Sequence, residues 1–258
     1  MPKSLLPLAA TLAGLSVIAF VVGALMIGIG FALPAAGGAA PESPGWEDGH
    51  PVGLYLMTRF WIGTGSLEKA SYYFTSDGRV YVDPQEGFSD EELARHQGRH
   101  GTVRGGDGEL IFTWSDGKEQ RGRLERGEGR GFTWDMGIFA PVEPFDDEKE
   151  LVGRWEGGSS ASFAGTRGAT SRSFDLRDDG TFSGGSVATL QSASRESVAS
   201  AGSSGDHSGT WELDGYALVL TYDDGRTARG VVFPLDDEDT PVRPDRFYFA
   251  GTLYKKQG

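Results

Sequence analysis

One stretch of the sequence occurs twice without a gap, and this repeat constrains the fold more than any other feature. Residues 209–225 align with residues 101–117: a Gly-Thr pair, a leucine, a threonine and an Asp-Gly pair keep the same spacing in both copies. A second match places residues 174–182 on residues 72–80. The offset is 108 residues at the first match and 102 at the second, so six extra residues separate them in the later copy. The chain therefore predicts two related modules in tandem.

Both modules are expected to consist of short strands and tight turns. The Asp-Gly pair favours two-residue hairpins, because both central residues of such a turn need positive φ. It recurs beside apolar or aromatic runs, at Asp77, Asp107, Asp116, Asp179, Asp214 and Asp224. Forty glycines and an aromatic content of 11% are typical of the same architecture. We expect an all-β fold of two antiparallel meanders or barrels, with strands near residues 52–55, 72–74, 80–82, 101–104, 110–114, 121–124, 132–139, 151–155, 174–176, 218–222, 231–233 and 247–254.

An apolar segment precedes the modules. Residues 4–41 carry no charge, and residues 5–33 are almost continuously apolar. A helix over residues 8–33 would be about 39 Å long, more than the roughly 30 Å hydrocarbon core of a bilayer. The apolar part of a cleaved signal is only about 7–15 residues long. We therefore expect residues 1–33 to form an uncleaved transmembrane anchor, with Lys3 on the cytoplasmic side. A signal cleaved after the small residues 38–40 is the alternative.

The remaining chain divides by composition. Residues 34–51 are rich in proline and glycine and are expected to be an extended linker. The first module covers residues 52–145, an acidic hinge covers 146–150, and the second module covers 151–258. Calcium binding at the hinge is less favoured than a solvated linker, because the spacing of an EF-hand loop is missing.

Charge and cysteine content exclude several classes of function. The net charge is −13, and all 37 acidic residues follow position 41. Such an acidic surface repels phosphate backbones, so we expect no nucleic-acid partner. The absence of cysteine excludes disulfides and thiolate metal sites.

One short helix is expected within the first module. Ser89 and Glu92 form the spacing of a capping box, and Phe88 and Leu93 are placed as its hydrophobic staple. We expect this helix to be a lid that covers the mouth of its barrel through Phe88 and Leu93. The second module has a serine-rich run at the same place, residues 183–208, which is expected to be a long free loop.

The second module resembles a bacterial lipocalin-like domain. The resemblance rests on Leu151-Val152-Gly153-Arg154-Trp155, the Asp179-Gly180 turn, and Gly209-Thr210-Trp211 leading into the strand at 218–222. It covers residues 151–256 and, more weakly, residues 52–145. It implies an up-and-down β-barrel in which Gly153 and Trp155 match the Gly-x-Trp pair of the family. In that family the tryptophan plugs one end of the barrel.

The first module departs from this family pattern at one position. Gly53-x-Tyr55 stands where the family has Gly-x-Trp, so closure of the first barrel is in question. Both repeats are also shorter than a full-sized lipocalin, which does not favour a roomy cavity.

The residues give little sign of catalytic chemistry. His96 and His100 have a helical metal-ligand spacing, but Gly98 lies between them and no H-E-x-x-H pattern is present. We expect exposed loop histidines, no metal and no cofactor. The serines lie outside any G-x-S-x-G motif, and most carboxylates belong to turns. We therefore expect no catalytic residues and no enzyme activity.

Seven aromatic residues on expected strands are candidates for the barrel core or for the lining of a ligand cavity: Trp114, Trp134, Trp155, Phe174, Trp211, Tyr222 and Phe249. A filled interior favours a membrane-tethered structural or protein-interaction module outside the cytoplasm, facing the periplasm or the cell surface. A cavity would instead favour a binding protein for a small apolar or amphiphilic ligand.

Overall fold

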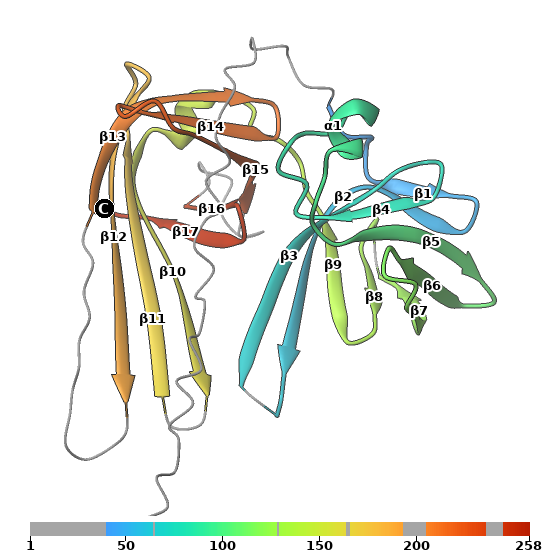
Figure 1. The fold of residues 1–258 in the computed structure, drawn as a ribbon. Coiled ribbons are helices and arrows are strands. Elements are labelled where there is room, and N and C mark those ends of the chain that lie inside the picture. Colours follow the sequence, from blue (N-terminus) through green and yellow to red (C-terminus); the bar gives the residue numbers. More distant parts are fainter. Residues whose placement is uncertain (1–39, 64, 128, 164–165, 193–204, 236–244) are drawn as a thin grey trace, which may run out of the picture.

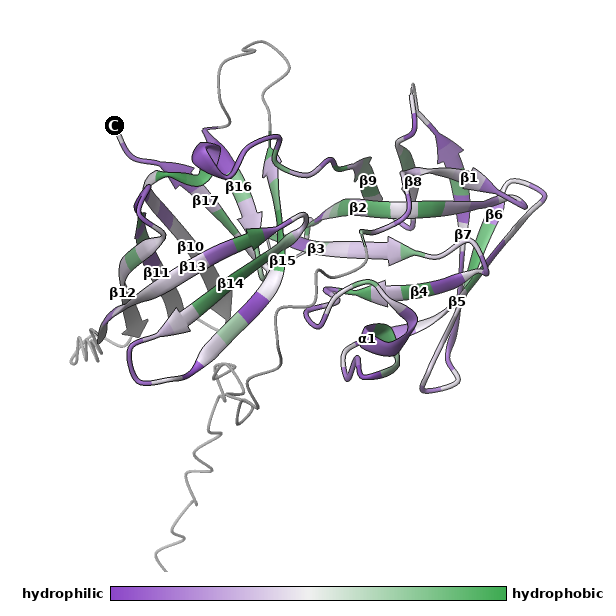
Figure 2. Ribbon diagram, turned by 90° about the horizontal axis from the view of Figure 1, so that it is seen from above, coloured by the Kyte–Doolittle hydropathy of each residue, from purple (hydrophilic) through white to green (hydrophobic). Residues whose placement is uncertain are grey.

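The computed structural model describes residues 40–63, 65–127, 129–163, 166–192, 205–235 and 245–258. These residues form two closed antiparallel β-barrels of eight strands each, placed side by side (Figure 1). The tandem all-β architecture expected from the repeat is confirmed. Figure 2 shows the same pair from above, with β3 of one barrel and β15 of the other near their contact.

The first barrel is closed by pairing between β2 and β9, which joins Tyr55 to Pro141 and Arg59 to Gly137. A short strand, β1, pairs with the first residues of β2. The strands of this sheet are β1 (Gly45–Glu47), β2 (His50–Trp61), β3 (Ser66–Phe74), β4 (Arg79–Val82), β5 (His100–Gly106), β6 (Glu109–Trp114), β7 (Glu119–Arg126), β8 (Phe132–Trp134) and β9 (Gly137–Pro141). The replacement of tryptophan by Tyr55 is therefore compatible with closure.

The second barrel repeats this order and is closed between β10 and β17. A single 3₁₀ turn, η1 (Glu148–Leu151), leads into it. Its strands are β10 (Gly153–Phe163), β11 (Thr166–Leu176), β12 (Thr181–Ser192), β13 (Gly205–Asp214), β14 (Ala217–Tyr222), β15 (Thr227–Leu235), β16 (Arg246–Phe249) and β17 (Thr252–Lys256).

The sequence repeat is a repeat of strand register. Gly101 pairs with Trp114 in the first barrel, and Gly209 pairs with Tyr222 in the second. A Cβ atom on Gly101 would lie 2.3 Å from the carbonyl oxygen of Thr113. The same atom on Gly209 would lie 2.0 Å from the carbonyl oxygen of Thr221. Both distances are far below van der Waals contact, so only glycine allows the neighbouring backbone to approach this closely.

The Asp-Gly turns are present, but they differ from the expected type. Glycine has positive φ at all six pairs, whereas the aspartate has positive φ only at Asp107. At Asp116, Asp179 and Asp224 the carboxylate instead accepts a hydrogen bond from the backbone N–H two residues later. These aspartates therefore shape the turn through side-chain hydrogen bonding.

The expected helix is α1 (Asp90–Ala94), and its capping box is complete. Ser89 accepts a hydrogen bond from the backbone N–H of Glu92, while the Glu92 carboxylate accepts one from the backbone N–H of Ser89. The helix ends at Arg95, before Gly98.

Three expected boundaries differ from the structure. The segment interpreted as a linker, 34–51, contains β1 and the first residues of β2, which the apolar pattern did not reveal. The acidic hinge is partly η1, whose final residue, Leu151, is fully buried. The serine-rich run is not a free loop at its ends, since β12 continues to Ser192 and β13 begins at Gly205. Residues 193–204 lie outside the described part.

The proposed membrane anchor, residues 1–33, also lies outside the described part of the chain. Among the residues that the structure describes, no helix combines the length and apolar character needed to span a membrane.

The close approach at Gly209 predicts the effect of adding one methyl group. Gly209→Ala should lower the free energy of unfolding by about 1–3 kcal/mol, because the Thr221 backbone has to move away. Gly106→Ala is the matched control, since nothing lies within 4 Å of the added atom and its φ is not positive. Urea titrations followed by fluorescence should show a lower midpoint for the Gly209 variant alone. Equal midpoints for both variants would contradict this account of the repeat.

Candidate functional site

The aromatic residues singled out in the sequence lie in two separate barrel interiors. Trp114 and Trp134 belong to the core of the first barrel. Trp155, Trp211 and Phe249 belong to the core of the second. Phe174 and Tyr222 are half-buried and pack against that second core. The structure therefore does not bring all seven residues together around one cavity.

Stacked rings occupy the interior of the first barrel. The ring centroids of Phe112 and Trp134 are 4.1 Å apart, and those of Phe132 and Phe139 are 4.4 Å apart. Such distances correspond to direct ring contact and leave no room for a ligand between them. Trp134 also donates a hydrogen bond from Nε1 to the backbone oxygen of Leu110 at 3.0 Å, so its polar group is satisfied inside the core.

A polar network lies at the end of the first barrel where β8 turns into β9. Trp114 donates from Nε1 to Oε1 of Gln120 at 3.2 Å, and Gln120 donates from Nε2 to Oδ2 of Asp135 at 2.5 Å. Asp135 is also 3.4 Å from the guanidinium of Arg59, which is only 7% exposed. Trp114, Gln120 and Asp135 are thus hydrogen-bonded to one another, whereas the buried Nε of Arg59 has no hydrogen-bond partner among the described residues.

A continuous series of rings fills the core that the described residues form in the second barrel. Trp155 packs edge-on against Phe247 at 4.7 Å, Phe247 stacks on Tyr254 at 5.0 Å, and the Tyr254 and Phe174 centroids are 5.2 Å apart. Trp155 is fully buried and donates from Nε1 to the backbone oxygen of Leu151 at 2.7 Å. This hydrogen bond ties the η1 turn to one end of the barrel.

Tyr55 has the equivalent role in the first barrel. It is fully buried, and its hydroxyl donates to the backbone oxygen of Gly45 in β1 at 3.1 Å. Burial raises the pKa of Tyr55 to about 12. In both barrels the aromatic residue of the Gly-x-aromatic pair, Tyr55 or Trp155, therefore donates a hydrogen bond to the segment that leads into the barrel.

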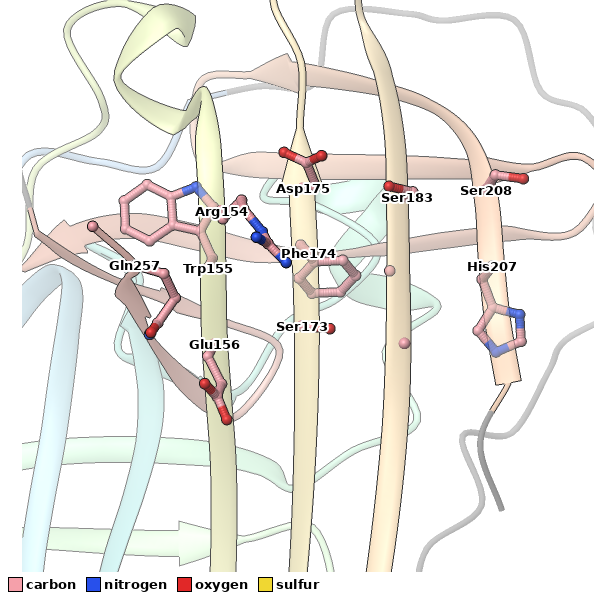
Figure 3. Close-up of a pocket in the computed structure, with 13 residues that line it drawn as sticks. Arg154, Trp155, Glu156, Ser173, Phe174, Asp175, Ser183, His207, Ser208 and Gln257 are labelled. Carbon is pink, nitrogen blue, oxygen red and sulfur yellow. The ribbon is translucent and has the colours of Figure 1, made fainter. Parts of the chain in front are cut away.

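A polar hollow of about 890 Å³ lies on strands β10 to β13 of the second barrel (Figure 3). Trp155 and Phe174 point into the core, so strand alternation places Arg154, Ser183 and Ser208 on the outer face. Two hydroxyl groups of the hollow already have partners. Ser183 accepts a hydrogen bond from Arg177 at 2.7 Å, and Ser208 donates to the Asp223 carboxylate.

The sequence predicts exposed loop histidines, but His50 is buried in β2, the His96 side chain is only 4% exposed, and His100 and His207 lie in strands. His207 packs edge-on against Tyr222, with centroids 5.7 Å apart. His96 and His100 are also edge-on, at 6.0 Å, and Nδ1 of His100 is 2.9 Å from the backbone oxygen of Gly98. No group of three His, Cys, Asp or Glu side chains suited to a metal ion occurs among the described residues.

A third apolar cluster joins the outer faces of the two barrels, and we call it the seam. Phe88 and Leu93 belong to the seam, so they pack between the barrels and not over the mouth expected for a lid. The prediction of a lid is therefore wrong. The sequence shows that the helix has an apolar side, but it does not show which part of the molecule covers that side. The buried residues of the seam are Leu54, Leu56, Tyr73, Tyr81, Phe88, Leu93, Val142, Tyr216, Val231, Phe233 and Tyr248.

Polar contacts fix the register of the seam. The Tyr248 hydroxyl donates to Oδ1 of Asp83 at 2.6 Å and accepts from the backbone N–H of Ser71 at 3.2 Å. The Tyr216 hydroxyl donates to the backbone oxygen of Val142 at 3.0 Å. Arg229 lies 3.6 Å from the carboxylate of Glu92 in α1. The capped helix is thus part of the contact with the second barrel.

Beside the seam is a groove of about 690 Å³, lined by residues of both barrels that include Leu56, Ile138, Val142 and Leu235. It continues toward a surface that the sequence analysis missed. Six large apolar side chains of the described residues are exposed, and all six lie at one end of the first barrel. We call them the apolar tip: Phe60, Trp61, Ile62, Leu67, Met136 and Ile138.

A signal for the apolar tip was present in the sequence. Residues 60–67 carry no charge, in a chain of which 24% of residues are charged. The strands expected from the sequence end near residue 55 and resume near residue 72, so this uncharged run received no interpretation. The uncharged run indicates an exposed surface only when it is also known that the closed wall of the barrel ends before these residues.

Comparison of the chain with protein-family models, curated proteins and solved structures gives no match. The two closed eight-stranded barrels are consistent with a calycin-like fold.

The seam predicts a large effect for one substitution in α1. Leu93 is only 3% exposed, so Leu93→Ala should lower the free energy of unfolding by about 2–5 kcal/mol. Leu67→Ala removes the same atoms from a side chain that is 53% exposed and is the matched control. Thermal unfolding should show a clear drop for the first variant and a small change for the second. Equal, small changes would mean that α1 does not hold the barrels together.

Buried tyrosines predict loss of stability at alkaline pH. Burial raises the pKa of Tyr72 and Tyr73 to about 12, and burial beside Asp83 raises that of Tyr248 further. A raised pKa in the folded state contributes stability below the unfolded value, about 10, and this contribution disappears as pH rises through the folded value. The free energy of unfolding should therefore fall above about pH 10. Tyr248→Phe should make this fall shallower in urea titrations at a series of pH values, whereas an unchanged slope would contradict the assignment.

Proposed function

We propose that this chain is a membrane-tethered protein-interaction module outside the cytoplasm, which works through the outer surfaces of its barrels and performs no catalysis. The observation that carries the proposal is the filling of both interiors by aromatic rings in contact, such as Phe112 with Trp134 and Trp155 with Phe247. A filled barrel has no internal site for a substrate, so its outer face is the surface left for function.

The seam supports an interaction role. It holds two barrels in a fixed relation through apolar packing and through the Tyr248–Asp83 and Tyr216–Val142 hydrogen bonds. Such a joined pair offers a larger continuous surface than either barrel alone, as partner binding requires. The groove beside the seam is lined by both barrels and is a candidate for part of that surface.

The tether and the location rest on the amino-terminal sequence. The uncharged, apolar residues 5–33 are long enough to cross a bilayer, and Lys3 favours a cytoplasmic amino terminus. The barrels would then face the periplasm or the cell surface. The Gly153-x-Trp155 pair and the closed eight-stranded barrel support membership of the second module in the lipocalin-like family.

A second candidate function is the binding of a small amphiphilic ligand by the second barrel. Phe174 and Tyr222 are only half-buried, so the ring series is less tightly covered at this end. Burial raises the pKa of Tyr254 to about 12, and the positive charge of the exposed Arg172 nearby opposes this increase. An exposed cation beside half-buried rings suits a ligand with an apolar body and an acidic group.

Native mass spectrometry of the detergent-purified full chain distinguishes the two candidates. The proposed function predicts the mass of the polypeptide with a co-purifying protein and without a small molecule. Retention of a small molecule, lost in Phe174→Ala, would favour the ligand-binding candidate.

Protease added to intact spheroplasts tests the proposed topology. It should digest the barrels, because a single crossing places them outside. Their full protection in sealed cells, with digestion after lysis as the control, would overturn the tether.

A further inference from the structure

We propose that the apolar tip is a second membrane contact, which inserts shallowly into the lipid surface beside the tether. The inference rests on the proposed membrane tether and adds a lipid-binding surface to it. In Figure 1 the β2–β3 hairpin that carries most of the tip points to the bottom of the view, as do the ends of β10 and β12.

The first argument is that the hairpin extends beyond the barrel. Pairing between β2 and β9 ends at Arg59 and Gly137, whereas β2 and β3 stay paired to Trp61 and Ser66. The residues after Arg59 therefore project past the closed wall. Phe60 is opposite Leu67 on this hairpin, and these side chains are 56% and 53% exposed.

The second argument is that the exposure is concentrated. Ile62 at the turn is 87% exposed, and Met136 on the neighbouring β8–β9 turn is 69% exposed. Ile138 pairs with Thr58 of β2. Thr58 lies two residues before Phe60, so both side chains are on the same face of β2. A cluster of exposed apolar side chains at one end of a molecule marks an interaction site more clearly than scattered ones do.

The chemistry of the tip fits a lipid surface. Residues 60–67 carry no charge, and the cation that precedes them in the chain, Arg59, is 3.9 Å from Glu68 and 3.4 Å from Asp135. Trp61 is 40% exposed, and its Nε1 donates to Glu68 at 2.9 Å. Tryptophan with one polar and one apolar side prefers the membrane–water interface. A narrow, projecting hairpin also differs from the broad surface of a stable protein interface.

The tether is long enough for both contacts to meet one membrane. Glu42 lies at the opposite end of the barrel from the tip, because its carboxylate accepts from the backbone N–H of Ser76 at 3.0 Å. The strand from Gly53 to Trp61 covers about 26 Å at roughly 3.3 Å per residue. The nine residues from 33 to 42 span at most about 30–32 Å when extended. A fully extended linker of this length is therefore sufficient to bring the end of the proposed anchor to the level of the tip.

Flotation with phosphatidylcholine vesicles tests the proposal without the tether. Residues 40–258 contain all the described strands and both cores, so this fragment keeps what folds the barrels. It should float with the vesicles. Combined Phe60→Ser, Ile62→Ser and Leu67→Ser substitutions should lower its partition coefficient at least about tenfold. Their side chains are exposed, so the melting temperature should remain close to that of the parent fragment.

Val219→Ser is the matched control, since this half-buried valine lies on the outer face of β14 in the other barrel. It should float like the parent fragment. Equal flotation of the triple variant would overturn the proposal. So would a fragment that stays in the aqueous phase and forms a dimer which the triple variant abolishes, because the tip would then bind a second copy.

Quenching in nanodiscs gives an independent readout on the full chain. Phosphatidylcholine with brominated acyl chains should quench the part of the emission that Trp61→Phe removes. No difference in quenching between the two proteins would place the tip away from lipid.

A different result is expected if the proposed membrane tether is wrong. Extraction of the full chain by alkaline carbonate, with flotation of the fragment intact, would reject the anchor and leave the tip contact standing.

Discussion

Both barrels depend on one close contact between backbones. At Gly101 and Gly209 the adjacent strand passes so near that a Cβ atom would lie within 2.3 Å of a carbonyl oxygen. Next to each glycine the hydrogen bonding is also the same, from Ser115 to the oxygen of His100 and from Asp223 to that of Ser208. Glycine permits a bend that a side chain would prevent, and such bends let a short sheet curve until its edges meet. A barrel closed this tightly has a narrow interior, which large aromatic rings fill.

The sequence predicted features that depend on local geometry. The register of the repeat, the strands beside Asp-Gly turns and the capping box at Ser89 are each determined by a few neighbouring residues, and the structure contains them. Features that depend on distant contacts were missed. Phe88 and Leu93 were correctly interpreted as apolar anchors, but the barrel that covers them begins about 60 residues later in the chain. Likewise, β1 depends on pairing with β2, and its three residues alone do not predict that pairing.

The candidate site was predictable in its membership but not in its geometry. The sequence placed Trp114, Trp134, Trp155 and Trp211 on expected strands, as candidates for the core or for a cavity lining, and they are buried. Whether inward rings leave a cavity depends on distances between them, which a sequence does not contain. The described ring contacts fill the two cores, so the seam and the apolar tip are the surfaces considered for function. Trp134 and Trp155 donate to backbone oxygens and Tyr248 donates to Asp83 across the seam, so these three buried polar groups are hydrogen-bonded.

Charge decides how the proposed membrane contact would work. A net charge of −13 repels anionic head groups, so the body of the protein gains nothing from approaching them. The rim of the apolar tip adds no net charge, because Arg59 and Lys69 are balanced by Glu68 and Asp135. The contact would therefore depend on apolar burial alone, which screening by salt does not weaken. A tip of this size binds shallowly and reversibly, and the tether raises its effective concentration at the membrane surface. In that arrangement the anchor holds the chain at the membrane, while the tip sets which way the joined barrels face.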